Sequence, residues 1–210
     1  MNKSFVFDLD GTLLDTGADL ALSMNYALRT MGFPEKDKDV LVTYVGDGLE
    51  EYIHRAFETE DVKIEKKAKI LFEDFYRNHN HEATILYDGV VETLKELQSR
   101  NAKLFVLSNK PIEFIPTLLK KLDIHEYFTD LIGQYSLPQI KPDPAGLYYL
   151  MKKYKLERQN MFMIGDNYTD IEAGASAQVK TVFCSFGLGR LSDVVPDFSI
   201  DTFKDLLKFI

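Results

Sequence analysis

The chain has 210 residues, of which 45% are hydrophobic and 28% are charged. This length and composition are typical of a globular protein of one or two domains, and they exclude disordered, collagen-like and low-complexity chains. Asp and Glu number 33 against 25 Lys and Arg, which gives a net charge of −8. We expect no nucleic-acid partner, because binding to a phosphate backbone needs a basic face.

The first residues and the single cysteine indicate the compartment. Three apolar residues precede Asp8, fewer than the roughly 7 that a secretory signal needs. No segment approaches the ~18 apolar residues of a membrane span, so no membrane partner is expected. Cys184 has no second cysteine to pair with, which favours a reducing environment. The sequence therefore predicts a cytoplasmic protein with Cys184 as a core residue.

Short apolar segments alternate with helical patterns along the chain. Apolar residues recur at helical spacing over residues 91–97, 115–122 and 147–154. Strands that alternate with helices favour a doubly wound, Rossmann-like α/β fold with a parallel sheet. The segments that we expect as strands are residues 4–7, 103–107, 130–133, 161–164 and 181–184.

A long insertion separates the first expected strand from the second. About 90 residues lie between Gly11 and Ala102, whereas a complete βαβ unit needs only about 30. Residues 17–80 carry three stripes of apolar residues at helical spacing and no strand pattern. We therefore expect a core domain from residues 1–15 and 84–210, with an inserted all-helical domain at residues 16–83.

Polar residues follow the expected strands, at the sheet edge where ligands of open parallel sheets bind. Asp8 and Asp10 are two apart on an extended segment, so their side chains leave the same face. Two carboxylates this close repel each other unless a cation lies between them. Asp166 would complete an oxygen site of the kind Mg²⁺ prefers, and Ser108 and Lys141 would donate to a phosphate. The pattern favours phosphoryl transfer with an Asp nucleophile.

Four motifs in order make the chain similar to the haloacid dehalogenase superfamily. The first is Asp-Leu-Asp-Gly-Thr at residues 8–12, the second is Ser108 after its strand, the third is Lys141 before Pro142, and the fourth is residues 165–170. The insertion resembles the helical cap of subfamily I. The Gly-Asp-Gly-Leu turn at residues 46–49 resembles that of phosphoglycolate phosphatase-like enzymes.

The resemblance implies a mechanism and a role for each motif residue. Asp8 would attack phosphorus, and Asp10 would protonate the leaving oxygen and then activate water. Mg²⁺ would bind Asp8, the main-chain carbonyl of Asp10, and Asp166. Asp170 and Asn167 would lie behind these groups, with Asp170 orienting Lys141 or a metal-bound water. The substrate-binding residues would be Thr12, Gly48, Ser108, Asn109 and Lys141.

The predicted function is a Mg²⁺-dependent phosphatase for a small phosphorylated metabolite, phosphoglycolate or a similar phosphomonoester. Alternatives are a pyrophosphatase, a nucleotidase, a phosphomutase or a non-catalytic phosphate-binding regulator, and the protein would be a monomer or homodimer. Asp170 has a second interpretation as a helix cap, and Asn167 as a turn residue. Lys110 is interpreted as a surface lysine, and His79 and His81 as part of a solvated hinge rather than a metal site.

Overall fold

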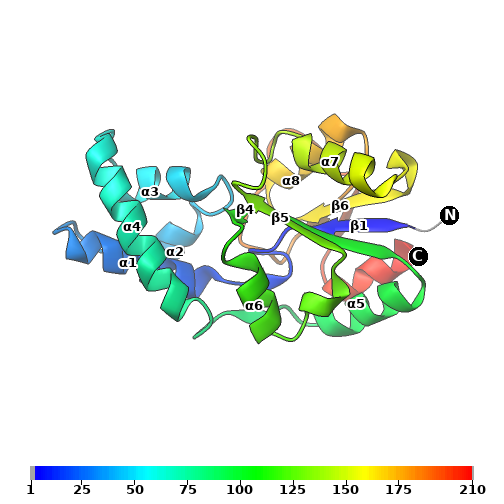
Figure 1. The fold of residues 1–210 in the computed structure, drawn as a ribbon, viewed down its shortest axis with the longest axis horizontal. Coiled ribbons are helices and arrows are strands. Elements are labelled where there is room, and N and C mark those ends of the chain that lie inside the picture. Colours follow the sequence, from blue (N-terminus) through cyan, green and yellow to red (C-terminus); the bar gives the residue numbers. More distant parts are fainter. Residues whose placement is uncertain (1–2, 210) are drawn as a thin grey trace.

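The computed structural model describes residues 3–209, which fold into an α/β part and a helical part side by side (Figure 1). Within these residues the α/β part holds a six-stranded parallel sheet in the order β5-β4-β1-β6-β7-β8. This arrangement confirms the doubly wound α/β fold. The strands are β1 (Ser4–Phe7), β4 (Lys103–Pro111), β5 (Asp130–Gln134), β6 (Met161–Gly165), β7 (Lys180–Cys184) and β8 (Phe198–Ile200).

Strand β1 lies between β4 and β6, and its register with both strands determines which residues emerge together at the carboxyl edge of the sheet. Phe7 is paired with Val106 of β4 on one side and with Ile164 of β6 on the other. All four residues of β1 are buried, as expected for a parallel strand covered on both faces. Because the three strands run in parallel, the residues that follow these pairs emerge at one edge.

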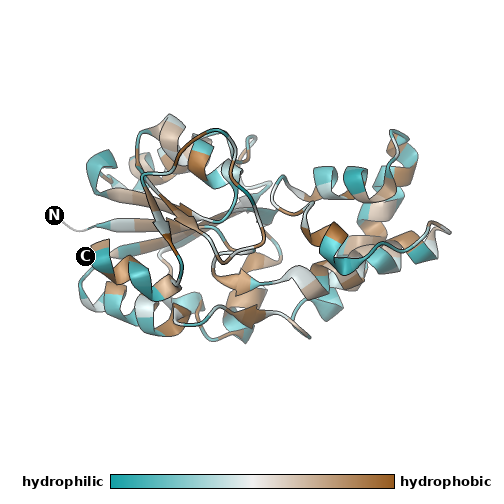
Figure 2. Ribbon diagram, turned by 180° about the vertical axis from the view of Figure 1, so that it is seen from behind, coloured by the Kyte–Doolittle hydropathy of each residue, from teal (hydrophilic) through white to brown (hydrophobic). Residues whose placement is uncertain are grey.

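Helices cover both faces of the sheet (Figure 1). Phe5 and Phe7 belong to the apolar cluster that contains residues of α5 (Val90–Ser99) and α6 (Ile115–Lys121). Val6, between them, belongs to the cluster with α7 (Ala145–Tyr154) and α8 (Tyr168–Ala177). This alternation is the period of two of a β-strand. Figure 2 shows hydrophobic residues gathered on the strands and hydrophilic residues along the outer sides of the helices.

The helical part has an apolar core of its own. It contains α1 (Gly17–Thr30), α2 (Lys38–Val42), α3 (Leu49–Phe57) and α4 (Val62–His79). The three predicted stripes supply this core, and their buried members include Met24, Ile53 and Phe72. The short helix α2 was not predicted, because its five residues include two charged ones and carry no helical stripe.

Two short antiparallel strands join the parts, β2 (Leu14–Asp15) and β3 (Ile85–Leu86). Near them the buried carboxylate of Asp19 accepts hydrogen bonds from the backbone N–H groups of Ala83 and Thr84 and from the Thr84 hydroxyl. These hydrogen bonds attach the segment that leads back to the α/β part to the start of α1. We therefore keep residues 16–83 as our proposed inserted domain.

The remaining elements are three short 3₁₀ helices, at His125–Tyr127, Arg158–Asn160 and Phe203–Phe209. Strands β2, β3 and β8 were not predicted, because each has only two or three residues. Strand β4 continues past the predicted residues 103–107 to Pro111, with a shift in register before Pro111. Within residues 3–209, no helix combines the length and apolar character required to cross a bilayer.

Candidate active site

Lys141 lies between two carboxylates at the carboxyl edge of the sheet. Its Nζ is 2.9 Å from Oδ1 of Asp8 and 2.5 Å from Oδ1 of Asp170. All three side chains are buried. Burial lowers the pKa of Lys141, but the charges of Asp170 and Asp8 outweigh this effect and raise it overall. Lys141 is therefore a fixed ammonium directly beside the predicted nucleophile.

Asp8, Asp166 and Asp170 form a buried acidic cluster. Each offers a carboxylate oxygen, and these atoms lie within 4.8 Å of one another. The Asp166 carboxylate accepts hydrogen bonds from the Thr12 hydroxyl and from the N–H groups of Leu188 and Gly189. Burial, with the charges of Asp8 and Asp170, nevertheless raises the pKa of Asp166 to about 8.

The donor set of this cluster fits a divalent metal ion. Like charges held together away from water favour protonation of one carboxyl unless a cation balances them. Lys141 provides one positive charge for three carboxylates, and oxygen ligands are those that hard divalent cations prefer. Asp8 and Asp166 could therefore hold the metal, whereas both oxygens of Asp170 are engaged, one by Lys141 and the other by the N–H of Asn167.

Gly11 is required where the chain turns after β1. Its φ is +86°, a conformation that L side chains rarely adopt, and a Cβ there would lie 2.1 Å from Oδ2 of Asp166. The glycine of the first motif therefore lets the backbone come close to the Asp166 carboxylate. Gly187, from the loop after β7, approaches Asp166 in the same way, so two glycines make room for one carboxylate.

Asn109 connects three segments around the site. Its Nδ2 donates to the carbonyls of Gly46 and Lys141, each at 2.8 Å, and its Oδ1 accepts from the N–H of Lys141 at 2.9 Å. These bonds fix the Lys141 loop and hold the 46–48 turn of the helical part against the sheet. The side chain that we predicted to bind substrate is thus engaged with the backbone.

The other predicted residues fall into two groups. Ser108 and Gly48 line the same cavity as Asp8, Asp10 and Asn109. Thr12 is fully buried and donates to Asp166, so it lies behind the carboxylate and not on the cavity wall. Asn167 caps α8 and donates to the carbonyl of Val45, and Asp170 completes the capping box while pairing with Lys141. Asp170 therefore contacts both Lys141 and the start of α8, where Asn167 and not Asp170 is the N-cap.

The interpretation of Lys110 as a surface lysine is wrong. Its side chain is only 2% exposed, and its Nζ lies 3.0 Å from Oδ1 of Asp10. It also lies 4.7 Å from the centre of the Tyr76 ring. Burial lowers the pKa of Lys110, but the charge of Asp10 outweighs this effect and raises it overall. Lys110 is buried because β4 extends four residues beyond the predicted strand, to Pro111.

The cavity measures about 50 Å³ and lies between the two parts of the molecule. The sheet edge provides the polar groups, and α3 and α4 provide aromatic residues, among them Tyr52, Phe72 and Tyr76. Sequence reasoning did not single out these tyrosines. Tyrosines in an amphipathic helix are typical of an apolar core. No signal in the sequence distinguishes a tyrosine that lines a cavity from a tyrosine of such a core.

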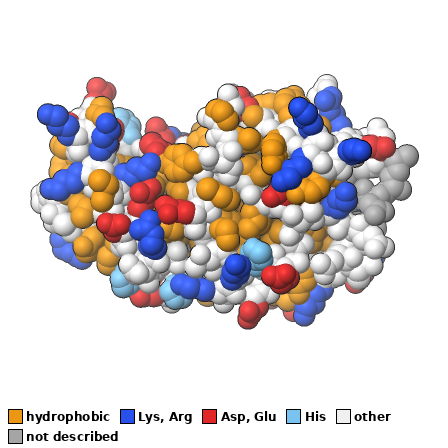
Figure 3. Space-filling view, in the orientation of Figure 1, with side chains coloured by type: hydrophobic (Ala, Val, Ile, Leu, Met, Phe, Trp, Pro, Cys, Tyr) orange, Lys and Arg blue, Asp and Glu red, His pale blue; other side chains and the backbone are white. Residues whose placement is uncertain are grey.

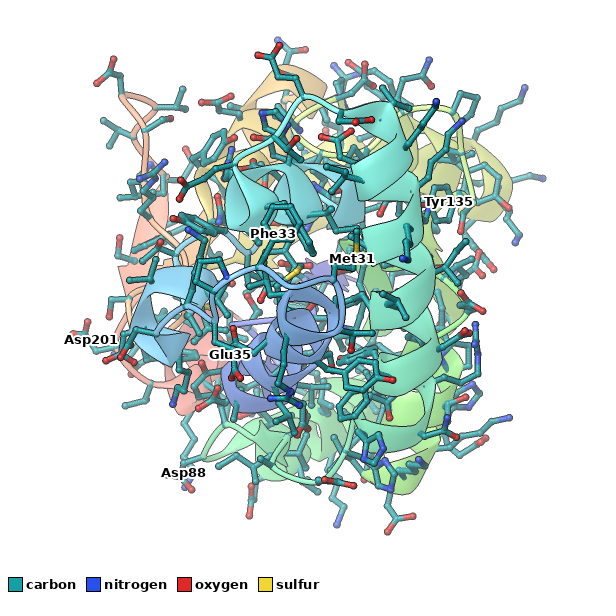
Figure 4. The ribbon with its side chains drawn as sticks, turned by 90° about the vertical axis from the view of Figure 1, so that its left-hand side faces the viewer. Met31, Phe33, Glu35, Asp88, Tyr135 and Asp201 are labelled. Atoms are coloured by element: carbon teal, nitrogen blue, oxygen red, sulfur yellow. The ribbon has the colours of Figure 1, made fainter. Side chains whose placement is uncertain are left out.

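Polar contacts close the helical part over the sheet. Glu50 of α3 binds the side chains of Gln134 and Tyr135, and Lys69 of α4 donates to both Glu50 and Tyr135. Figure 4 shows Tyr135 beside α4. On the face seen in Figure 3, acidic and basic side chains are interspersed.

The two histidines predicted to lie in a solvated hinge are partly or fully exposed. His79 pairs with Glu82, and His81 lies beside Lys121. In the described part of the chain neither belongs to a group of side chains arranged to hold a metal. Cys184 is buried and free, as predicted for a core residue.

The family description "haloacid dehalogenase-like hydrolase" matches residues 5–184. The phosphoglycolate phosphatase of Vibrio vulnificus is 36% identical, over 99% of this chain and 96% of that protein. The phosphoglycolate phosphatase of Haemophilus influenzae is 35% identical over the whole of both chains. A crystal structure described as a predicted phosphoglycolate phosphatase from Haemophilus somnus superposes with a TM-score of 0.94, at 33% identity, over 99% of this chain and 97% of that one. These matches confirm the prediction of a phosphoric monoester hydrolase, and the chain belongs to the haloacid dehalogenase-like hydrolase family.

Proposed function

We propose that the protein is a Mg²⁺-dependent phosphatase that hydrolyses a small phosphomonoester through an aspartyl-phosphate on Asp8. The observation that carries the proposal is the placement of Lys141 between Asp8 and Asp170, beside a buried acidic cluster and under a cavity. The names of the full-length relatives make 2-phosphoglycolate the first substrate to test.

Asp8 is the nucleophile in this proposal. Its carboxylate lines the cavity and pairs with Lys141, so a phosphoryl group bound there would meet both. Lys141 and Ser108 would bind the phosphoryl oxygens and balance the negative charge that develops in the transition state. Asp170 holds Lys141 from behind and is a positioning residue.

Asp10 is the general acid and base. It lies two residues from Asp8 on the same edge and lines the same cavity. It would give a proton to the leaving oxygen and take one from the water that hydrolyses the aspartyl-phosphate. Lys110 holds both oxygens of this carboxylate, at 3.0 and 3.1 Å, and so keeps it in place.

Mg²⁺ would be held by Asp8, Asp166 and the main-chain carbonyl of Asp10. When bound, it would offset the negative charge of the phosphoryl group and of the carboxylates around it. Residues 16–83 would act as a cap that closes on the substrate and excludes bulk water. The contacts of Gly46, Val45 and Glu50 with the sheet edge support this role.

The test is phosphate release from 2-phosphoglycolate, sugar phosphates, nucleotides and pyrophosphate, with Mg²⁺ and with EDTA. We expect Mg²⁺-dependent release from a small phosphomonoester and none from Asp8→Asn. In Asp10→Asn, intact-protein mass spectrometry should detect one added phosphoryl group on the chain after mixing with substrate. A folded protein that releases no phosphate from any of these compounds would overturn the proposal.

A further inference from the structure

Three side chains with hydrogen-bond donors line the cavity and have no contact with the phosphoryl group in the proposed chemistry. They are Tyr52, Tyr76 and Lys110, of which Lys110 also holds Asp10 in place. Both tyrosines are buried, at 4% and 0% exposure. Neither hydroxyl has a hydrogen-bond partner of ordinary geometry among the described residues, although the Lys110 ammonium is near enough to interact with the Tyr76 hydroxyl. A buried hydroxyl without a partner is costly, which suggests that a ligand supplies one.

The two phenol rings are held rigidly. The ring of Tyr52 meets that of Phe72 edge-on, with centroids 6.0 Å apart, and Phe72 stacks on Tyr76 at 5.4 Å. Phe114, just after β4, packs edge-on against Tyr76 at 5.1 Å. This packing holds both rings in the wall of the cavity.

The groups are suited to an anion. Burial raises the pKa of Tyr76 to about 12 and also that of Tyr52, so both phenols keep their protons at neutral pH. Among the described residues that line the cavity, Lys110 is the only cation. An ammonium has three N–H donors, and Asp10 is the one carboxylate within ion-pair distance of it. The set therefore offers two O–H donors and an N–H donor that is not engaged by Asp10.

The size of the cavity limits what this anion can be. A single water molecule needs roughly 10–15 Å³, so about 50 Å³ admits a group of only a few non-hydrogen atoms. A carboxylate on a short carbon chain fits this space and accepts hydrogen bonds on both of its oxygens.

We propose that Tyr52, Tyr76 and Lys110 bind a carboxylate of the substrate, and that the substrate class is small phosphorylated carboxylic acids. The inference rests on the proposed function, since the phosphoryl group of the same molecule would lie against Asp8 and Lys141. The helical part thus selects the acid by two phenols, and the sheet edge contributes the ammonium.

The experiment compares 2-phosphoglycolate with 2-hydroxyethyl phosphate, in which a hydroxymethyl group replaces the carboxylate. The measured quantity is the ratio of the two kcat/KM values. We expect the ratio to be well above 1 in the unchanged protein and to fall about tenfold in Tyr52→Phe and in Tyr76→Phe, mainly through KM, because each loses a hydrogen bond to a charged group. Lys110→Met should lower the ratio as well.

Tyr26→Phe is the matched control. Tyr26 lies on α1 in the same helical part and stacks on Phe75 at 4.3 Å, but it does not line the cavity. This variant should keep both kcat/KM values. Thermal melting checks that every variant is folded. A ratio near 1 in the unchanged protein, or equal losses on both esters in the two cavity variants, would overturn the inference.

Binding separates this inference from the proposed function. Calorimetry with Asp8→Asn and Mg²⁺ measures the affinity of each ester without turnover. We expect tighter binding of 2-phosphoglycolate, with the preference reduced in Asp8→Asn/Tyr52→Phe. If the unchanged protein hydrolyses neither ester but the binding preference appears, the proposed function fails and the carboxylate site stands. Equal affinities for both esters would refute the carboxylate site, whether or not phosphate is released.

Discussion

Lys141 and Asp170 form an ion pair from which water is excluded on both sides, with side-chain exposures of 1% and 0%. Asp170 also belongs to the first turn of α8, where its second oxygen accepts the N–H of Asn167. One carboxylate therefore fixes a helix end and the ammonium beside the nucleophile. The position of Lys141 depends on the start of α8.

Replacing Asp170 by Asn should lower kcat at least about tenfold. The amide can still accept the Asn167 N–H, but it no longer balances the charge of Lys141, so the ammonium is drawn to Asp8 alone. Steady-state kinetics on the preferred substrate measure the effect. Asp130→Asn is the control, because it breaks an Asp–Lys pair with the exposed Lys153 and should leave kcat unchanged. Equal kcat values in the two variants would contradict the prediction.

The acidic cluster should make the stability of the metal-free protein fall as pH rises. Asp166 has a pKa of about 8 in the folded chain against an ordinary value of 3.8. Between these values the folded state binds more protons than the unfolded state, so stability decreases with increasing pH. We expect Tm to fall between pH 5 and pH 8, by about 2–4 °C for each kcal/mol lost.

Adding Mg²⁺ should reverse this loss. The cation competes with protons for the carboxylates, so it should raise Tm more at pH 8 than at pH 5. Scanning calorimetry with EDTA and with Mg²⁺ measures both effects. Asp166→Asn should flatten the pH dependence and weaken the response to Mg²⁺. A metal-free Tm that rises steadily from pH 5 to pH 8 would contradict the assignment.

Gly11→Ala should abolish activity, and Gly32→Ala should not. Both glycines have a positive φ, +86° and +78°, so either substitution strains the backbone by about 1–2 kcal/mol. At Gly32 a Cβ meets no atom within 4 Å, whereas at Gly11 it lies 2.1 Å from Asp166. Denaturant unfolding should show that the backbone strain destabilises both variants. Phosphate release should be lost in Gly11→Ala alone, because only there does the added Cβ displace Asp166. Retained activity in Gly11→Ala would contradict the clash.

Asn109→Ala should reduce kcat/KM by roughly tenfold or more and destabilise the fold by about 1–3 kcal/mol. The substitution removes the bonds to Gly46 and Lys141 and leaves their backbone groups without partners. Asn78→Ala is the comparison, because Asn78 is exposed on α4 and its side chain donates to the carbonyl of Asp74 in the same helix. Kinetics with chemical denaturation test the prediction, and an unchanged kcat/KM would show that Asn109 does not position Lys141.

The sequence by itself determined five of the six strands that the structure describes in the sheet, and the identity of the charged groups at its edge. The buried run of Phe5–Phe7 specifies a central parallel strand, because such a strand needs apolar residues on both faces. Asp8 and Asp166 directly follow their strands, so parallel pairing brings them to one edge whatever the details of the helices. The helical stripes likewise predicted the apolar core of residues 17–80, since their spacing is local.

Only the tertiary structure decided the surroundings of those groups. Lys110 was misread because its burial depends on an extension of β4 and on contact with Asp10 and Tyr76, which are 100 and 34 residues away in the chain. Tyr52 and Tyr76 follow the helical stripe of ordinary core residues. Their hydroxyls become available to a ligand only where α3 and α4 pack against the sheet edge, and no local pattern encodes that contact.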